Sequence, residues 1–174
     1  MKKSLVLTGM MGSGKSSIGK ILSKELKMDF FDIDKIIEKK EKISIEKIFQ
    51  PKGEVFFRNL EKKITLKFLN KAGTIISLGG GAFMNTNIRK KALSSCISFW
   101  LDVDLNTLVK RVNNKTSKRP LLINKNSTKE MEKIFNDRAK YYALANFRIR
   151  CKNQNKKLIV EKILKIYEKN LNKN

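Results

Sequence analysis

The sequence of 174 residues contains no histidine, only two cysteines and two prolines, and no apolar run of membrane-spanning length. Without histidine the chain lacks the usual general base and the commonest metal ligand, so Asp, Glu, Lys or Tyr must carry any acid–base chemistry. Cys96 and Cys151 have no metal-binding spacing and indicate free thiols in a reducing, cytoplasmic setting. A spanning helix needs about 20 apolar residues, and the short apolar stretch near the N-terminus has no leader-like cleavage site. We therefore expect a cytoplasmic protein with no membrane association.

Arginine is also scarce, although the chain is strongly basic. Lys and Arg number 39 against 16 Asp and Glu, for a formal net charge of +23, but only 7 of the basic residues are Arg. A protein that reads nucleic acid is expected to use Arg, whose planar fork binds phosphate and guanine in a bidentate manner. Lysines spread along the whole chain favour a solvated surface instead. We therefore expect no nucleic-acid partner.

Short apolar segments alternate with helical patterns along the chain. Strands are expected at 4–8, 29–32, 74–78, 96–101 and 147–151, with helices of period 3.6 between them. This alternation predicts a five-stranded parallel sheet covered by helices on both faces, a three-layer α/β/α sandwich. We expect one domain over residues 1–174, with a helical segment at about 33–61 and a mostly polar, mobile lid at about 113–126. The helices are expected at 15–27, 34–41, a short one opened by Ser44, 55–71, 87–93, 104–112, 127–145 and 156–170.

The segment Gly9–Ser16, GMMGSGKS, matches the phosphate-binding pattern G-x-x-x-x-G-K-[ST] in full. It follows an apolar strand and opens a helix, which is the context that the pattern requires. Glycines allow backbone N–H groups to turn toward phosphate oxygens, and the helix N-terminus adds its positive dipole end. Lys15 is expected to reach the β- and γ-phosphates. The residues predicted to bind ATP here are Gly12, Ser13, Gly14, Lys15, Ser16 and Ser17.

Two carboxylates, Asp32 and Asp34, follow the second strand. The third strand ends in glycines rather than in an acid, so Asp32 is the best candidate to hold Mg²⁺ together with the Ser16 hydroxyl. Asp34 is then free to face the phosphoryl acceptor. Alternatively, Asp34 is only the N-cap of the next helix. The chain has no N-K-x-D guanine motif and is short for a motor, which disfavours a GTPase and a motor ATPase.

Six motifs in order resemble the shikimate kinases, of the nucleoside-monophosphate-kinase group of P-loop folds. They are GMMGSGKS at 9–16, FFDID at 30–34, GEVFFRNLE at 53–61, SLGGGAF at 77–83, RPLL at 119–122 and RAKYY at 138–142. The resemblance implies ATP-dependent phosphorylation of the 3-hydroxyl of shikimate by a monomer, with Mg²⁺ as cofactor. Another small-molecule kinase, such as a gluconate kinase, is the nearest alternative. A basic P-loop ATPase that binds nucleic acid is a more distant one.

The resemblance also assigns roles to residues of this chain. It implies that Lys15, Asp34 and Arg119 are catalytic, with Asp34 against the acceptor hydroxyls and Arg119 in the lid. The implied shikimate-binding residues are Asp34, Arg58, Gly79, Gly80, Gly81 and Arg138, and Arg111 is implied to stack on adenine. Four of the seven arginines thus fall on functional positions, and two arginines suit a carboxylate better than lysines do. No role follows for Arg89, Arg148 and Arg150.

Two further expectations concern residues outside these motifs. Lys42 stands where the family often has glycine, at the entry to the short helix. Trp100 and Phe56 are expected in the core.

Overall fold

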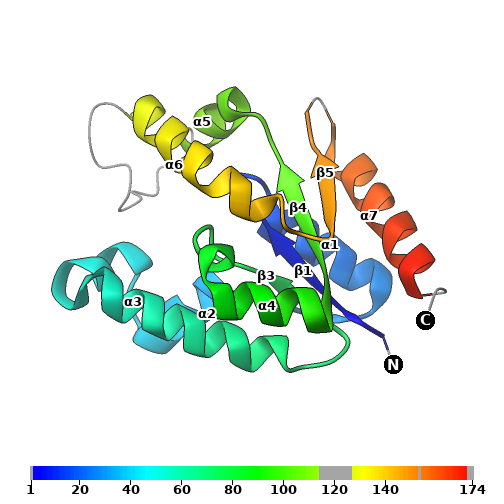
Figure 1. The fold of residues 1–174 in the computed structure, drawn as a ribbon, viewed down its shortest axis with the longest axis horizontal. Coiled ribbons are helices and arrows are strands. Elements are labelled where there is room, and N and C mark those ends of the chain that lie inside the picture. The colour runs from blue at the N-terminus through cyan, green and yellow to red at the C-terminus, as the bar shows by residue number, and fades with distance from the viewer. Residues whose placement is uncertain (1, 114–126, 153, 172–174) are drawn as a thin grey trace.

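The structure is a computed structural model that describes residues 2–113, 127–152 and 154–171. Five strands alternate with helices, as the sequence predicts, and the fold is an α/β sandwich of the P-loop type (Figure 1). In chain order the elements are β1 (Ser4–Thr8), α1 (Lys15–Leu26), β2 (Asp29–Asp32), α2 (Ile33–Glu41), α3 (Ile45–Leu69), β3 (Thr74–Ser77), the 3₁₀ turn η1 (Ala82–Met84), α4 (Thr86–Ser95), β4 (Cys96–Asp102), α5 (Leu105–Asn113), α6 (Ser127–Tyr142), β5 (Phe147–Arg150) and α7 (Lys156–Leu171).

The sheet has the strand order β2-β3-β1-β4-β5, and every neighbouring pair is parallel. All five residues of β1 are buried, and β4 is buried up to its last residue. Such continuous apolar strands are typical of a parallel sheet that is covered on both faces. Because β1 lies in the centre between β3 and β4, the loop that follows it is placed at the middle of one sheet edge.

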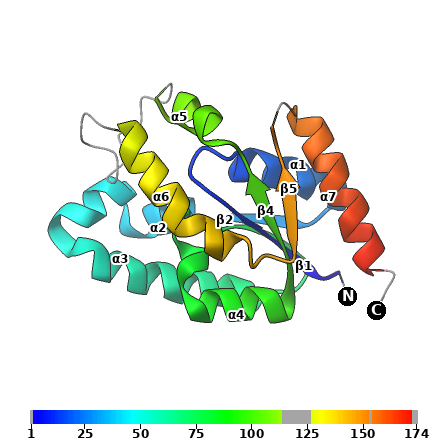
Figure 2. The same ribbon diagram turned by 45° about the horizontal axis from the view of Figure 1, so that its top comes forward.

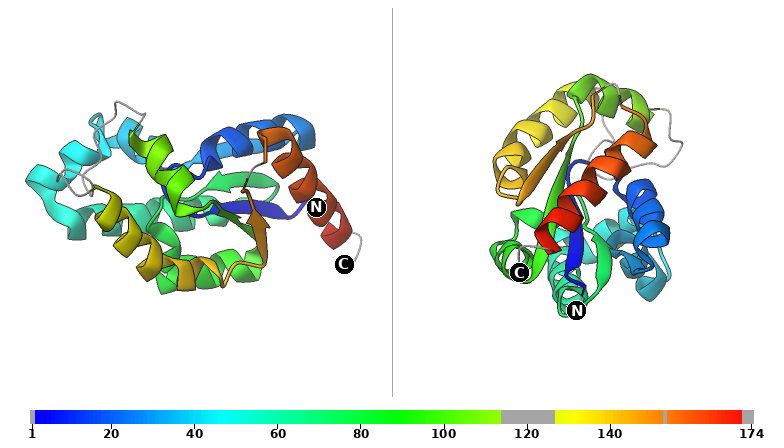
Figure 3. Two further views of the ribbon diagram at one scale, coloured as in Figure 1. Left: turned by 90° about the horizontal axis from the view of Figure 1, so that it is seen from above. Right: turned by 90° about the vertical axis from the view of Figure 1, so that its right-hand side faces the viewer.

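Helices form the two outer layers. Helices α1 and α7 pack together on one face, and α4 and α6 lie on the other (Figure 3). Helix α6 contacts α5 and η1, and Figure 2 shows it running from beside α5 toward the start of β5. The helices α2 and α3 project past the end of the sheet in Figure 1. The carboxyl ends of β1, β2 and β3 therefore open toward α2, α3 and α6, the position at which α/β proteins bind ligands.

The segment after α2 agrees with the prediction of two helices. Ser44 caps the first of them through a bond from the Lys47 amide to its hydroxyl, 3.4 Å. Within α3 the helical backbone is interrupted at Gly53, which has φ 73° and ψ 170°, so a kink separates the short helix from the long one. Lys42 ends α2 with φ 59°, the left-handed region in which glycine is favoured. That geometry explains why a glycine suits this position.

The core expectations were right for Trp100 and wrong for Phe56. Trp100 is buried between the phosphate loop and α6: its Cδ1 lies 3.4 Å from where a Gly9 Cβ would be, and its ring centroid lies 6.1 Å from that of Tyr142. Phe56 is 38% exposed, whereas the adjacent Phe57 is buried. Neighbouring helical residues point about 100° apart, so only one of the pair can face the core.

Both cysteines are free and buried, and burial raises the pKa of each thiol to about 11. Within the described residues, none of the helices has the length and apolar character needed to cross a membrane.

Candidate active site

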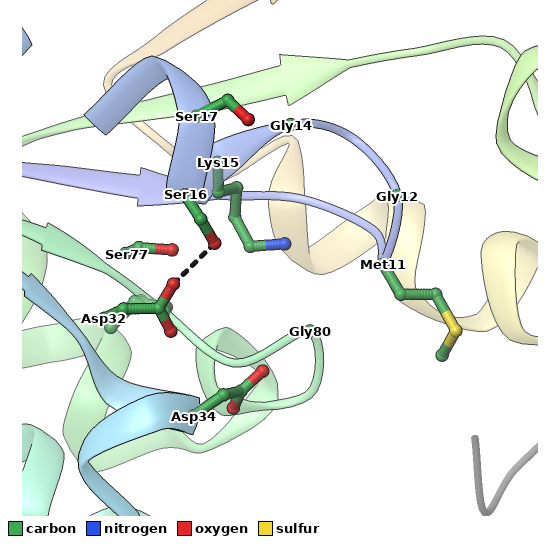
Figure 4. Close-up of a pocket in the computed structure, with 11 residues that line it drawn as sticks. Met11, Gly12, Gly14, Lys15, Ser16, Ser17, Asp32, Asp34, Ser77 and Gly80 are labelled. Carbon is green, nitrogen blue, oxygen red and sulfur yellow. Dashed lines mark hydrogen bonds between the residues drawn. The ribbon is translucent and has the colours of Figure 1, made fainter. Parts of the chain in front are cut away.

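The loop after β1 forms the floor of a pocket at the carboxyl ends of the strands. Gly9, Gly12 and Gly14 have φ values of 135°, 78° and 94°, a region that side-chain-bearing residues rarely adopt. Gly14 is also the N-cap of α1, so the loop feeds directly into the helix N-terminus. Figure 4 shows the pocket, which is lined by Met11, Gly12, Gly14, Lys15, Ser16, Ser17, Asp32, Asp34, Ser77, Leu78 and Gly80.

Lys15 is buried inside this loop. Its ammonium group donates to the carbonyl oxygens of Gly9 at 2.8 Å and Met10 at 3.0 Å. Ser13 is also buried, and its Oγ has no hydrogen-bond partner among the described residues. The loop therefore holds one cation and one unsatisfied hydroxyl at the point where the motif predicts phosphate oxygens.

Ser16 and Asp32 meet across the pocket. The Ser16 hydroxyl donates to Asp32 Oδ2 at 2.5 Å (Figure 4), and Asp32 Oδ1 accepts from the Lys35 amide at 3.4 Å as the N-cap of α2. The alternative in which Asp34 caps this helix is therefore wrong. Among the described residues no three Cys, Asp or Glu side chains cluster as a metal site. A hydroxyl and one carboxylate nevertheless fit Mg²⁺, which usually takes one or two protein oxygens and completes its shell with water and phosphate.

Asp34 lies in the first turn of α2, beside the glycine turn that follows β3. A methyl group on Gly79 would collide with Asp34 Oδ1, at 2.6 Å, and also with Glu61 Oε1. The two carboxylates therefore converge on Gly79. Burial, followed by the charge of Glu61, raises the pKa of Asp34 from 3.8 to about 6, while Lys15 opposes the shift. The Asp34 carboxyl is thus set to exchange a proton near neutral pH.

Arg58 is held on α3 by two glutamates one helical turn away. Its Nη1 donates to Glu61 Oε2 at 2.8 Å, and its Nε donates to Glu54 Oε1 at 3.2 Å. Glu61 is buried and Glu54 is exposed, so the inner pair fixes the guanidinium more firmly than the outer one does. A Cβ on Gly81 would lie 2.7 Å from Arg58 Nη1, which shows how closely the glycine turn approaches this guanidinium.

Arg138, near the end of α6, approaches the same turn at the neighbouring glycine. It is buried, and its Nη1 lies 3.3 Å from where a Gly80 Cβ would be. Two guanidinium groups therefore lie close to the glycine turn, at Gly80 and Gly81, and Asp34 lies at Gly79 in the pocket that the phosphate loop also lines. Such a paired cationic fork suits a carboxylate ligand.

Arg111 and Arg119 complete the predicted set. Arg111 is exposed on α5, where its Nη1 donates to the Gly12 carbonyl at 3.3 Å, so it lies against the phosphate loop. Arg119 and residues 114–126 of the lid predicted at about 113–126 lie outside the described residues, and Asn113 is the last residue of α5. The structure thus brings together every described residue of the predicted set, with Arg111 at the outer edge.

Three residues at this site received no role from the sequence: Glu61, Tyr142 and Arg89. For Glu61, its spacing of one helical turn from Arg58 could have indicated their ion pair. Tyr142, whose hydroxyl donates to the Gly80 carbonyl, and Arg89, whose Nη1 donates to the carbonyls of Phe83 and Met84, had no such signal.

Comparison with known proteins identifies the family. The model of the shikimate kinase family matches residues 11–168. The shikimate kinase of Sulfurihydrogenibium sp. is 43% identical over 162 residues, which span 93% of this chain and 96% of that protein. The shikimate kinase of Bacillus licheniformis is 40% identical over 153 residues, covering 87% of this chain and 86% of the other.

Solved structures agree in fold. Shikimate kinase from Acinetobacter baumannii, in complex with shikimate, superposes with a TM-score of 0.91 at 27% identity, over 97% of this chain and 94% of that one. Shikimate kinase from Aquifex aeolicus superposes with a TM-score of 0.84 at 32% identity, over 97% of this chain and 98% of that one. A gluconokinase from Sinorhizobium meliloti superposes with a TM-score of only 0.59 at 16% identity, over 97% of this chain and 93% of that one. This likeness shows a shared fold alone. Sequence motifs, fold and relatives all agree: the chain belongs to the shikimate kinase family.

Proposed function

We propose that this protein transfers the γ-phosphoryl group of ATP to the 3-hydroxyl of shikimate, giving shikimate 3-phosphate and ADP. The observation that carries the proposal is the close approach of Arg58, Arg138 and Asp34 to the same glycine turn, beside the pocket of the phosphate loop. Shikimate is a carboxylated polyol, and this arrangement supplies a cationic fork for the carboxylate and an acid–base group for a hydroxyl. The structure of a shikimate kinase in complex with shikimate supports the same acceptor.

The chemistry follows from the positions of the charged groups. Phosphoryl transfer proceeds through a loose transition state that needs charge neutralisation and alignment more than covalent help. Lys15 would exchange its bonds to the Gly9 and Met10 carbonyls for phosphate oxygens. Asp34 would orient the attacking hydroxyl and accept its proton, a role for which a pKa of about 6 is suited at neutral pH.

Mg²⁺ fits between Ser16 and Asp32, whose oxygens would hold it. When bound, the ion would neutralise charge on the β- and γ-phosphates. Arg111 would contact the adenine, and the resemblance assigns Arg119 of the lid to the transferring phosphates. We further propose that the protein acts as a cytoplasmic monomer without a nucleic-acid partner.

The decisive experiment is an ADP-release assay with purified protein and Mg·ATP. Release should depend on shikimate and should be small with gluconate or a nucleoside monophosphate as acceptor. ADP release at the same rate with and without shikimate would overturn the proposal.

Two variants test the roles of the acceptor-side residues. Arg58→Lys keeps the charge and loses the fork, so we expect shikimate affinity to fall about tenfold or more while ATP affinity changes less than about twofold. Equal losses for both ligands would make Arg58 a structural residue.

Asp34→Asn should lower turnover by about 10²-fold or more with nucleotide affinity nearly intact. Near-normal turnover would remove Asp34 from the chemistry.

A further inference from the structure

The glycine turn after β3 is anchored along its length through its carbonyl oxygens. Within the turn and η1, the carbonyls of Gly79, Gly81 and Ala82 accept from the amides of Ala82, Met84 and Asn85 at 3.1 to 3.2 Å. These local bonds shape the turn. They do not tie it to the rest of the molecule.

Two side chains provide that tie. The Tyr142 hydroxyl donates to the Gly80 carbonyl, and Arg89 Nη1 donates to the carbonyls of Phe83 at 3.0 Å and Met84 at 2.9 Å. The Arg89 guanidinium also lies 5.2 Å from the centre of the Tyr141 ring, so both anchors involve the last turn of α6. That helix passes beside η1 in Figures 1 and 2.

The position of Tyr142 is informative. It is fully buried, its ring packs against Trp100, and its hydroxyl lies 3.8 Å from the sulfur of Met10 in the phosphate loop. A Gly80 Cβ would be 3.6 Å from the Met11 amide nitrogen and 3.3 Å from Arg138 Nη1. The hydroxyl therefore holds Gly80 at the junction between the phosphate loop and the guanidinium of Arg138.

We propose that Tyr142 and Arg89 are positioning residues for the acceptor: they fix the glycine turn against the Arg58 and Arg138 guanidinium groups, so that the turn and the two groups together fit the acceptor carboxylate. Neither side chain is required to touch the acceptor. Without either anchor the turn can shift relative to the two guanidinium groups, and the acceptor carboxylate loses this fit. The inference rests on the proposed function, because it takes shikimate as the acceptor.

The chain offers a matched control for Tyr142. Tyr167 is buried to the same degree, its hydroxyl donates to the Lys3 carbonyl at 2.6 Å, and it lies 3.7 Å from the sulfur of Met28. Tyr142→Phe and Tyr167→Phe thus each remove one hydroxyl that donates to a backbone carbonyl and lies near a methionine sulfur. Only the first is at the glycine turn, so a general loss of stability affects both and a loss of positioning affects one.

The test measures steady-state kinetics, melting temperature and shikimate binding by titration calorimetry. Both tyrosine variants should melt at similarly lower temperatures. Only Tyr142→Phe should raise the KM and Kd for shikimate, by about fivefold or more, with the KM for ATP within about twofold of the unmodified protein. Equal shikimate constants in the two variants would overturn the role of Tyr142.

A variant at Arg89 gives a second, independent test of the positioning role, which can be made even if Tyr142→Phe does not fold. Arg148 is its control, because Arg148 also lies over an aromatic ring, Trp100 at 4.5 Å, and forms an ion pair with Asp102 at 2.8 Å. Arg89→Gln should raise the shikimate KM and Arg148→Gln should not; the same KM in both would overturn the role of Arg89. Absence of shikimate dependence in the unmodified protein would instead overturn the proposed function, before any variant is made.

Discussion

The Asp34 carboxyl should lower the free energy of unfolding at neutral pH, and Asp34→Asn should restore that free energy. The pKa of the carboxyl is raised in the folded protein, so the folded state favours the neutral form. Its contribution to stability is therefore present at low pH and is lost as the pH rises through about 6. Asp34→Asn removes the ionised form, so at neutral pH the variant should be more stable than the unmodified protein.

The size of the effect follows from the shift. The pKa rises from 3.8 to about 6, and each unit corresponds to about 1.36 kcal/mol, so the cost of ionisation approaches about 3 kcal/mol at pH 7.5. At pH 4 the carboxyl is neutral in the folded protein and half ionised in the unfolded one, so the cost falls below about 1 kcal/mol. The gain from Asp34→Asn should fall in parallel.

The measurement is urea unfolding at pH 7.5 and near pH 4, without nucleotide and with a chelator to remove metal ions. Asp29→Asn is the control, because Asp29 is exposed at the start of β2, the strand that leads into α2, and its replacement changes the net charge equally. The control should change the free energy of unfolding by less than about 0.5 kcal/mol. A variant at position 34 that is no more stable than the unmodified protein at pH 7.5, or equally stabilised at both pH values, would refute the reasoning.

Three further predictions concern backbone positions. Gly81→Ala would place a methyl group 2.7 Å from Arg58 Nη1, so the KM for shikimate should rise about tenfold or more in the ADP-release assay; an unchanged KM would argue against close approach of the turn to Arg58. Lys42→Gly relieves a left-handed residue with φ 59° and should raise the free energy of unfolding by about 0.5 to 1 kcal/mol; a loss on urea titration would contradict this. Gly19→Ala would push a methyl group into the Phe30 ring, within 2.9 Å of Cδ2, and should cost about 1 to 2 kcal/mol despite better helix propensity, so a stabilised variant would show that the ring can move freely.

The features predictable from the sequence are those encoded locally. The phosphate loop depends on glycines and a lysine within eight consecutive residues, and its strand and helix are set by adjacent apolar patterns. The helix cap at Ser44 is equally local. The Asp32 cap is local too, but two acids in the FFDID segment suited the capping position, and only the backbone distinguishes them.

The remaining features depend on contacts between distant segments. Tyr142 and Gly80 are 62 positions apart, and nothing near either residue indicates that a hydroxyl and a carbonyl will meet. The exposure of Phe56 depends on which face of α3 turns inward after the kink at Gly53. The convergence of Asp34 and Glu61 on Gly79 likewise requires α2, α3 and the end of β3 to be in place.

Trp100 is the sole tryptophan of the chain, and it lies between Gly9 of the phosphate loop and Tyr142 of α6. Indole emission responds to nearby charge and to small movements of its neighbours. The protein therefore contains its own optical reporter, placed where the nucleotide loop meets the helix that carries Arg138. We expect ligand binding to either half of the site to change this emission, so stopped-flow traces recorded without a label, with the two ligands added in each order, test which ligand binds first.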